Sequence, residues 1–204
     1  GGKMRAVLWC NGSIPSRSIT ESVISEESAL FGVDGGAEKA SDSGFRVTEA
    51  MGDLDSIDIQ AWRGGVQELP DQSSSDLAKS IGLLIERGFL EIDVIGVDGG
   101  TPDHLLGNWA ALCESPHGAC IRLHHEGHVT RRLHPEEGEV EIQIDEGVKF
   151  SVFALETGKV WINGAKWELS GEELAFSTLG LHNEGVGGLV SIRSEGVLAI
   201  VTPR

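Results

Sequence analysis

The sequence predicts two domains: an α/β N-terminal domain with a mostly parallel sheet and flanking helices, followed by an all-β, sandwich-like C-terminal domain. Over residues 4–116, short apolar runs alternate with patterns of helical period, which is typical of a parallel sheet. Over residues 119–204, the helical period is absent and short β-rich runs are separated by Gly, Glu and Asn turns. The turn residues at 114–118 (ESPHG) mark the expected boundary.

The apolar runs of the first domain have the length and composition of strands that are buried on both faces. We predict such strands at residues 5–10, 29–33, 48–51, 66–69 and 92–97.

Two helices are expected between and after these strands. Residues 76–87 place Leu77, Ile81 and Leu84 on one face, with serines before the segment as caps and Gly88 after it as a stop. Residues 103–113 carry a second apolar stripe behind Asp103, which is suited to the N-cap position.

The second domain has no comparable helical segment. Its β-rich runs are short and turn residues separate them, as in an antiparallel sandwich. We predict strands at residues 119–125, 140–144, 149–155, 159–163, 189–193 and 197–201.

Composition excludes several classes of partner. The 32 acidic and 16 basic side chains give a formal charge of -16, which argues against nucleic acid and anionic lipid as partners. The three cysteines lack a Cys-x-x-Cys spacing, so neither a disulfide framework nor a zinc ribbon is indicated. No apolar run reaches the ~20 residues of a membrane span. We therefore expect a cytoplasmic protein without a membrane partner.

Aspartates follow the predicted strands of the first domain. The carboxyl ends of parallel strands form one edge of a sheet, so these side chains are expected to converge on a single crevice. Close carboxylates repel one another unless a cation offsets their charge, which predicts a divalent metal that carries a phosphate ligand. The aspartates are Asp34, Asp53 with Asp55, Asp71 with Asp76, and Asp98 with Asp103.

Three motifs at or beside these aspartates suggest contacts to a metal or a phosphate. Asp53 and Asp55 can point to the same side of an extended backbone and bind magnesium, but Asp-x-Asp-Ser is also a good turn and helix cap. Gly35, after Asp34, can bring backbone N–H groups close to a phosphate. Lys79 can neutralise a phosphate or pair with Asp76 at i+3, and taken alone the pairing is favoured.

Five blocks, taken together and in order, resemble the thiamine pyrophosphokinase family. They are DGGAEKA, GDLDSI, DQSSSDLAKSI, GVDGGTPDHLLGN and, near the C-terminus, NGAKWELSGEELAFSTLGLHNEG. The resemblance spans nearly the whole chain. It implies transfer of a diphosphate group from ATP to thiamine, which gives thiamine diphosphate and AMP. It also implies a magnesium cofactor and a homodimer whose thiamine site lies between the subunits.

The resemblance implies roles for individual residues. Asp53, Asp55 and Asp76 correspond to magnesium ligands, and Asp103 to an acid that orients or deprotonates the thiamine hydroxyl. The remaining correspondences are Asp34 and Gln72 around the polyphosphate or metal, Lys79 on a phosphate, and Trp167 and Asn183 on thiamine, with Trp167 as a flat wall for the cationic ring. A tryptophan packed in a core or turn is the alternative for Trp167.

Two positions depart from the family pattern. Thr101 stands where the family usually has arginine, so a guanidinium that would bind phosphate oxygens is missing and another cation must replace it. His182 stands where serine is usual.

Three other functions stay open at this point: a diphosphokinase for another hydroxymethyl heterocycle such as a pterin alcohol, a non-catalytic nucleotide-binding sensor of the same fold, and a metal-dependent phosphohydrolase. Trp167 and Asn183 favour thiamine as the acceptor.

Overall fold

The computed structural model describes residues 4–53, 57–58 and 60–204, and Asp55 lies outside these ranges. The chain forms two compact units, Gly1–Glu126 and Gly127–Arg204. Among the described residues, no helix is long and apolar enough to cross a membrane.

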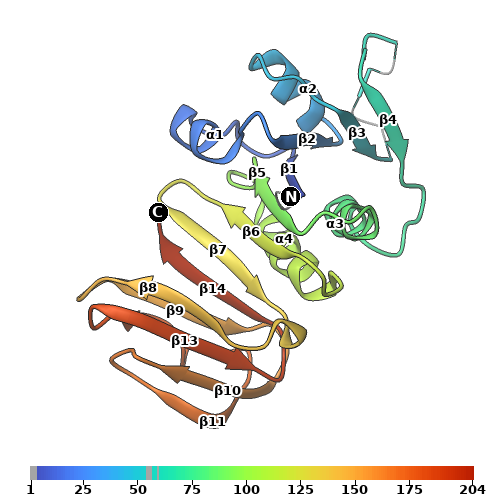
Figure 1. Ribbon diagram of the computed structural model, residues 1–204. Coiled ribbons are helices and arrows are strands. Elements are labelled where there is room, and N and C mark those ends of the chain that lie inside the picture. Colours follow the sequence, from blue (N-terminus) through green and yellow to red (C-terminus); the bar gives the residue numbers. More distant parts are fainter. Residues whose placement is uncertain (1–3, 54–56, 59) are drawn as a thin grey trace. The chain divides into compact units, whose positions relative to one another are not determined.

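The first unit is a parallel sheet with helices on both faces. The strands pair in the order β6-β5-β1-β2-β3-β4, and every pair is parallel. Helices α1 and α2 cover one face, and α3 and α4 cover the other (Figure 1). The elements are β1 Arg5–Trp9, α1 Arg17–Val23, β2 Ser28–Val33, α2 Gly36–Asp42, β3 Glu49–Gly52, β4 Gly65–Glu68, α3 Asp76–Glu86, β5 Glu91–Ile95, α4 Pro102–Glu114 and β6 Cys120–His124.

The predicted parallel strands are confirmed, but one of them is not buried on both faces. Strand β1 has four of its five residues buried, as a central strand between β2 and β5 should. In β4 three of the four residues are exposed. This correction has a simple cause: among the described strands, β4 pairs only with β3 and forms an edge of the sheet.

The strongest helical prediction is also confirmed. Helix α3 begins at the N-cap Ser75, whose Oγ accepts a hydrogen bond of 3.1 Å from the Ala78 N–H. For α4, the predicted cap at Asp103 was wrong. The N-cap is Thr101, because Pro102 occupies the first helical turn, where its missing N–H is tolerated.

The boundary between the units lies later in the chain than the predicted one at 116–119. Strand β6 pairs in parallel with β5, and its Ile121 and Leu123 are fully buried. Residues 119–125, which we assigned to the β domain, therefore belong to the parallel sheet. A short β-rich run does not reveal whether its partner strand will be parallel or antiparallel.

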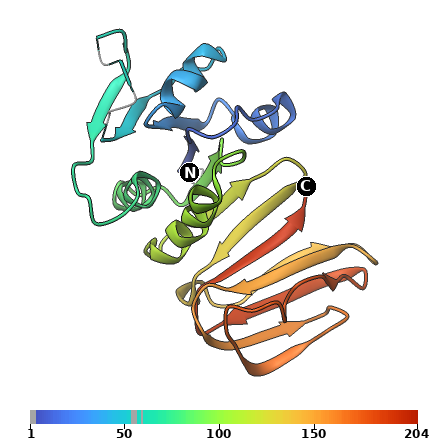
Figure 2. The same ribbon diagram turned by 180° about the vertical axis from the view of Figure 1, so that it is seen from behind.

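The second unit consists of two antiparallel sheets, with strand orders β12-β9-β14-β7 and β11-β10-β13-β8. Both sheets contribute to one hydrophobic core, for example through Val152 and Ile200 from the first and Val160 and Ile192 from the second. Figure 2 shows the same strands from behind. The elements are β7 His128–Leu133, the short 3₁₀ helix η1 Pro135–Glu137, β8 Val140–Ile144, β9 Lys149–Ala154, β10 Gly158–Asn163, β11 Leu169–Leu174, β12 Asn183–Glu184, β13 Gly188–Ser194 and β14 Leu198–Pro203.

Candidate active site

A cavity of about 650 Å³ lies at the carboxyl ends of β1, β2 and β5. In an open parallel sheet, ligands bind where the strand order reverses, and here that point lies between β1 and β5. The lining residues are Cys10, Asn11, Gly12, Ser13, Val33, Asp34, Lys39, Ser75, Asp76, Leu77, Gly96, Val97, Gly99, Gly100, Asp103, His104, Gly107 and Asn108.

The loops that leave β1 and β5 are joined by main-chain hydrogen bonds, which fixes one wall of the cavity. The N–H groups of Gly12 and Ser13 donate to the carbonyl oxygens of Gly96 at 2.9 Å and Asp98 at 2.8 Å. A Cβ atom on Gly12 would lie only 2.4 Å from the Gly96 oxygen, so the close approach of these two loops requires glycine at position 12. The sequence thus builds a rigid wall from backbone rather than from large side chains.

Three aspartates meet at this edge of the sheet. One carboxylate oxygen each from Asp34, Asp53 and Asp76 can be chosen so that all three lie within 4.8 Å of one another. They come from three segments: Asp34 follows β2, Asp53 follows β3, and Asp76 opens α3. Carboxylate oxygens at this spacing suit a hard divalent cation. The predicted convergence of strand-end acids is confirmed for these three side chains.

Asp34 has an unusual backbone conformation. Its φ angle is 49°, in the left-handed region, and its N–H donates to the Met51 oxygen at 2.8 Å. Its carboxylate lies over Gly52, where an added Cβ would be 2.1 Å from Asp34 Oδ1. Gly52 itself has φ 128°, so both its conformation and its lack of a side chain are needed for the cluster.

Lys79 and Gln72 lie outside the set of residues that line the cavity. Lys79 Nζ is 3.0 Å from Asp76 Oδ1 and donates to the Leu69 oxygen at 2.8 Å and to the Asp71 oxygen. The structure therefore contains the i+3 ion pair that the sequence left open. Gln72 is exposed, and its Nε2 donates to the Pro70 oxygen at 3.2 Å.

Asp103 lines the cavity from the first turn of α4. The Thr101 hydroxyl donates a hydrogen bond to Asp103 Oδ1. This bond is the main reason why the pKa of Asp103 is held below its ordinary value, with a smaller contribution from the His104 backbone N–H. Thr101, at the position where the resemblance leads us to expect arginine, thus orients an acid at the cavity.

Lys39 was missed from the sequence, although it belongs to the block DGGAEKA. Its Nζ donates to the carbonyl oxygens of Asn11 at 3.0 Å and Gly12 at 2.7 Å, and the side chain lines the cavity. The side chain of a helical residue points back towards the helix N-terminus, so a lysine in the short helical stretch after Asp34 could have been expected to reach the cavity.

Cys10 is a neutral group in the cavity wall. Burial, assisted by the charge of Asp34, raises the pKa of its thiol to about 12. The thiol is therefore protonated at neutral pH.

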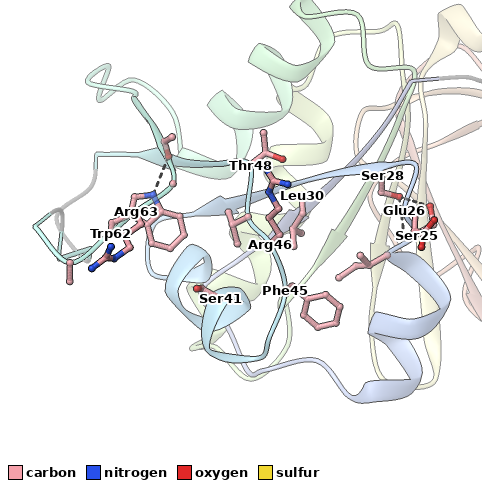
Figure 3. A pocket seen from close by; sticks show the side chains of 15 residues that line it. Ser25, Glu26, Ser28, Leu30, Ser41, Phe45, Arg46, Thr48, Trp62 and Arg63 are labelled. Atoms are coloured by element: carbon pink, nitrogen blue, oxygen red, sulfur yellow. Dashed lines mark hydrogen bonds between the residues drawn. The ribbon is translucent and has the colours of Figure 1, made fainter.

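A larger hollow, of about 1120 Å³, lies at the opposite edge of the sheet, by the amino ends of β2, β3 and β4. Figure 3 shows Arg46 between Trp62 on one side and Ser25, Glu26 and Ser28 on the other. Glu26 is its only acidic lining residue among those described. Volume alone would favour this hollow, but the acid cluster places the candidate active site at the carboxyl edge.

Residues 20–123, about half of the chain, match the family model described as "Thiamin pyrophosphokinase, catalytic domain". The chain belongs to the thiamin pyrophosphokinase family. Members of this family are diphosphotransferases, and the matched segment contains all three aspartates of the cluster. The predicted family and enzyme class are confirmed.

The thiamine pyrophosphokinase of Bacillus subtilis is 28% identical over 191 residues, which cover 83% of this chain and 88% of that protein. The crystal structure of the enzyme from the same organism has a TM-score of 0.77 at 24% identity and covers 98% of this chain and 99% of its own. The yeast thiamin pyrophosphokinase structure has a TM-score of 0.78 at 13% identity and covers 100% and 87%. These structural likenesses establish the shared fold.

Two residues that the thiamin pyrophosphokinase resemblance assigned to thiamine lie in the second unit. Asn183 is buried, and its Oδ1 accepts from the N–H groups of Trp167 at 3.2 Å and Glu184 at 2.8 Å, while its Nδ2 donates to the Trp167 oxygen at 2.8 Å. The amide of Asn183 is thus bound to backbone. Trp167 is 53% exposed, with Lys166 Nζ 4.7 Å from its ring centroid, which excludes a core role for its side chain.

Proposed function

We propose that the protein transfers the diphosphate group of ATP to the hydroxyl of thiamine and releases AMP. The observation that carries this proposal is the convergence of Asp34, Asp53 and Asp76 beside a cavity at the carboxyl edge of the family's catalytic domain. The oxygen of the thiamine hydroxyl forms a bond to the β-phosphorus. The bond from that phosphorus to the α–β bridging oxygen breaks, AMP leaves with the electron pair, and the hydroxyl proton passes to water.

We propose Mg²⁺ as the cofactor. Three carboxylate oxygens within 4.8 Å of one another fit a small divalent ion, and without such an ion their charges would repel. Asp34, Asp53 and Asp76 would hold it. When bound, the ion neutralises charge on the polyphosphate and makes the phosphorus a better electrophile.

Asp103 is proposed to orient the thiamine hydroxyl. Its pKa is lowered by the Thr101 hydrogen bond, so at neutral pH it is an ionised acceptor. A carboxylate with a low pKa is a weak base. Positioning of the hydroxyl, rather than removal of its proton, is therefore the role that this geometry supports.

The second unit is proposed to supply the thiamine site and the dimer contact. The exposed ring of Trp167 offers a flat surface to a cationic heteroaromatic ring, and Asn183 fixes the backbone that carries it. Large apolar side chains are exposed in the same unit, including Phe176 at 69% and Leu179 at 68%. Exposed apolar groups of this size favour a partner surface, and a second copy of the chain is the partner we propose.

An assay of AMP release tests the proposed function. Purified protein is incubated with ATP and Mg²⁺, with and without thiamine, and AMP is measured by a coupled reaction. Thiamine-dependent AMP is expected, and chelation of the metal should remove it. AMP that depends on a hydroxymethyl pterin instead, phosphate release without an acceptor, or nucleotide binding without turnover would each refute thiamine diphosphotransfer.

A further inference from the structure

We propose that Lys39 is the residue that binds the β- or γ-phosphate of the donor nucleotide. This inference rests on the proposed function, because it concerns the same cavity. It gives Lys39 a phosphate contact of the kind that the family resemblance implied for Lys79.

The charges of the cavity favour a fixed cation in its wall. Its lining includes Asp34, Asp76 and Asp103, and Asp53 belongs to the same acid cluster. Lys39 is the single lysine or arginine among the described lining residues. A polyphosphate carries several negative charges, and the acids repel it wherever a bound metal does not offset them. The one ammonium group in the wall is therefore well placed to attract the phosphates.

The hydrogen bonds of Lys39 hold its charge in place without neutralising it. An ammonium group has three N–H donors. Two of them are used by the Asn11 and Gly12 carbonyl oxygens, at 3.0 and 2.7 Å, and a carbonyl carries no net charge. One donor remains for a ligand. The loop that accepts these bonds is itself fixed to the β5 loop, so the cation is preorganised.

The other candidates are already engaged. Lys79 pairs with Asp76 at 3.0 Å and anchors the 69–71 loop, and it does not line the cavity. The Thr101 hydroxyl binds Asp103. Neither residue supplies an uncompensated positive charge at the cavity.

The test compares two ligands by isothermal titration calorimetry in the presence of Mg²⁺. One is α,β-methylene-ATP, in which carbon replaces the bridging oxygen and prevents transfer. The other is AMP, which lacks the β- and γ-phosphates. In Lys39→Ala, the affinity for the analogue should fall about tenfold, as expected for loss of a hydrogen bond to a charged group, while AMP binding should change by less than about twofold. Lys39→Arg should retain most of the affinity.

A matched control removes one positive charge elsewhere. Lys159→Ala, in β10 of the second unit, should bind both ligands as the unchanged protein does. The proposal is overturned if Lys39→Ala binds the analogue normally. It is also overturned if both ligands weaken equally together with a lower melting temperature, because that pattern means loss of the loop anchor alone. Selective weakening without any thiamine-dependent AMP would instead support Lys39 and refute thiamine as the acceptor.

Discussion

The amino ends and the carboxyl ends of the parallel strands form two opposite sides of the sheet, called here the amino edge and the carboxyl edge. These two sides differ in chemistry more than in shape. The amino edge has the larger hollow, with Arg46 and Trp62 in its lining, yet it brings no acid cluster together among the described residues. The carboxyl edge has the smaller cavity and gathers Asp34, Asp53 and Asp76 from three segments. In a parallel sheet all strands end on one side, so residues that follow different strands become neighbours there. Chain direction, and not cavity size, therefore points to the proposed site.

The largest effect should come from removing one acid of the cluster. Asp53→Asn keeps the shape but removes a charge, and we expect turnover to fall by at least about 10³-fold because charge stabilisation is lost. Arg46→Ala, at the opposite edge, should stay within about twofold. Steady-state AMP release measures both, and cooperative urea unfolding of each variant verifies the fold. Near-normal turnover in Asp53→Asn would mean that the acid cluster is not needed for the reaction, and would contradict the placement of the proposed site at the carboxyl ends of the strands.

A second variant tests the support of the cluster. Gly52→Ala introduces a Cβ 2.1 Å from Asp34 Oδ1 at a residue with φ 128°, so the carboxylate or the backbone must move. We expect a loss of about 1–3 kcal/mol in the free energy of unfolding and at least a tenfold loss of turnover. The matched control is Gly82→Ala in α3, where the added Cβ meets nothing within 4 Å. There, unfolding should become harder by up to about 1 kcal/mol.

A third variant separates the contributions of the two units. Trp167→Ala removes the exposed ring of the second unit and leaves the cavity of the first unchanged. The Michaelis constant for thiamine should rise about tenfold, by loss of a cation–π contact of roughly 1–2 kcal/mol. The affinity for α,β-methylene-ATP should not change. An unaltered Michaelis constant for thiamine would contradict the stacking role.

The smallest effect concerns the pH dependence of kcat/KM, through the ionisation of Asp103. Thr101→Val removes the hydroxyl donor that is the main cause of the lowered pKa, so the pKa of Asp103 should rise. In the proposed role the carboxylate of Asp103 acts in its ionised form, which is lost as pH falls through its pKa. The acidic limb of the kcat/KM profile should therefore move to higher pH, with turnover near neutral pH reduced by less than about threefold. A profile with an unmoved acidic limb would exclude Asp103 as the orienting acid.

Local patterns predicted the parts of the structure that depend on neighbouring residues along the chain. The buried run of β1 and the capped apolar face of α3 are set by side-chain periodicity and by Ser75. Strands β7 and β11 were not predicted, since HVTRRL and LSGEEL are rich in polar residues. Their hydrogen bonds to β14 and β10 supply the stabilisation that propensity does not.

The sequence by itself determined the enzyme class and the edge of the sheet at which the acids meet, because motif order and strand direction are properties of the chain. Only the tertiary structure decided which charged groups share the cavity. It paired Lys79 with Asp76 and with the carbonyl oxygens of the 69–71 loop, and it placed Lys39 at the cavity wall. The place of Lys39 depends on its bonds to loop 10–13, which is itself bonded to loop 96–99, and contacts between segments so far apart in sequence leave no periodic signal in any of them.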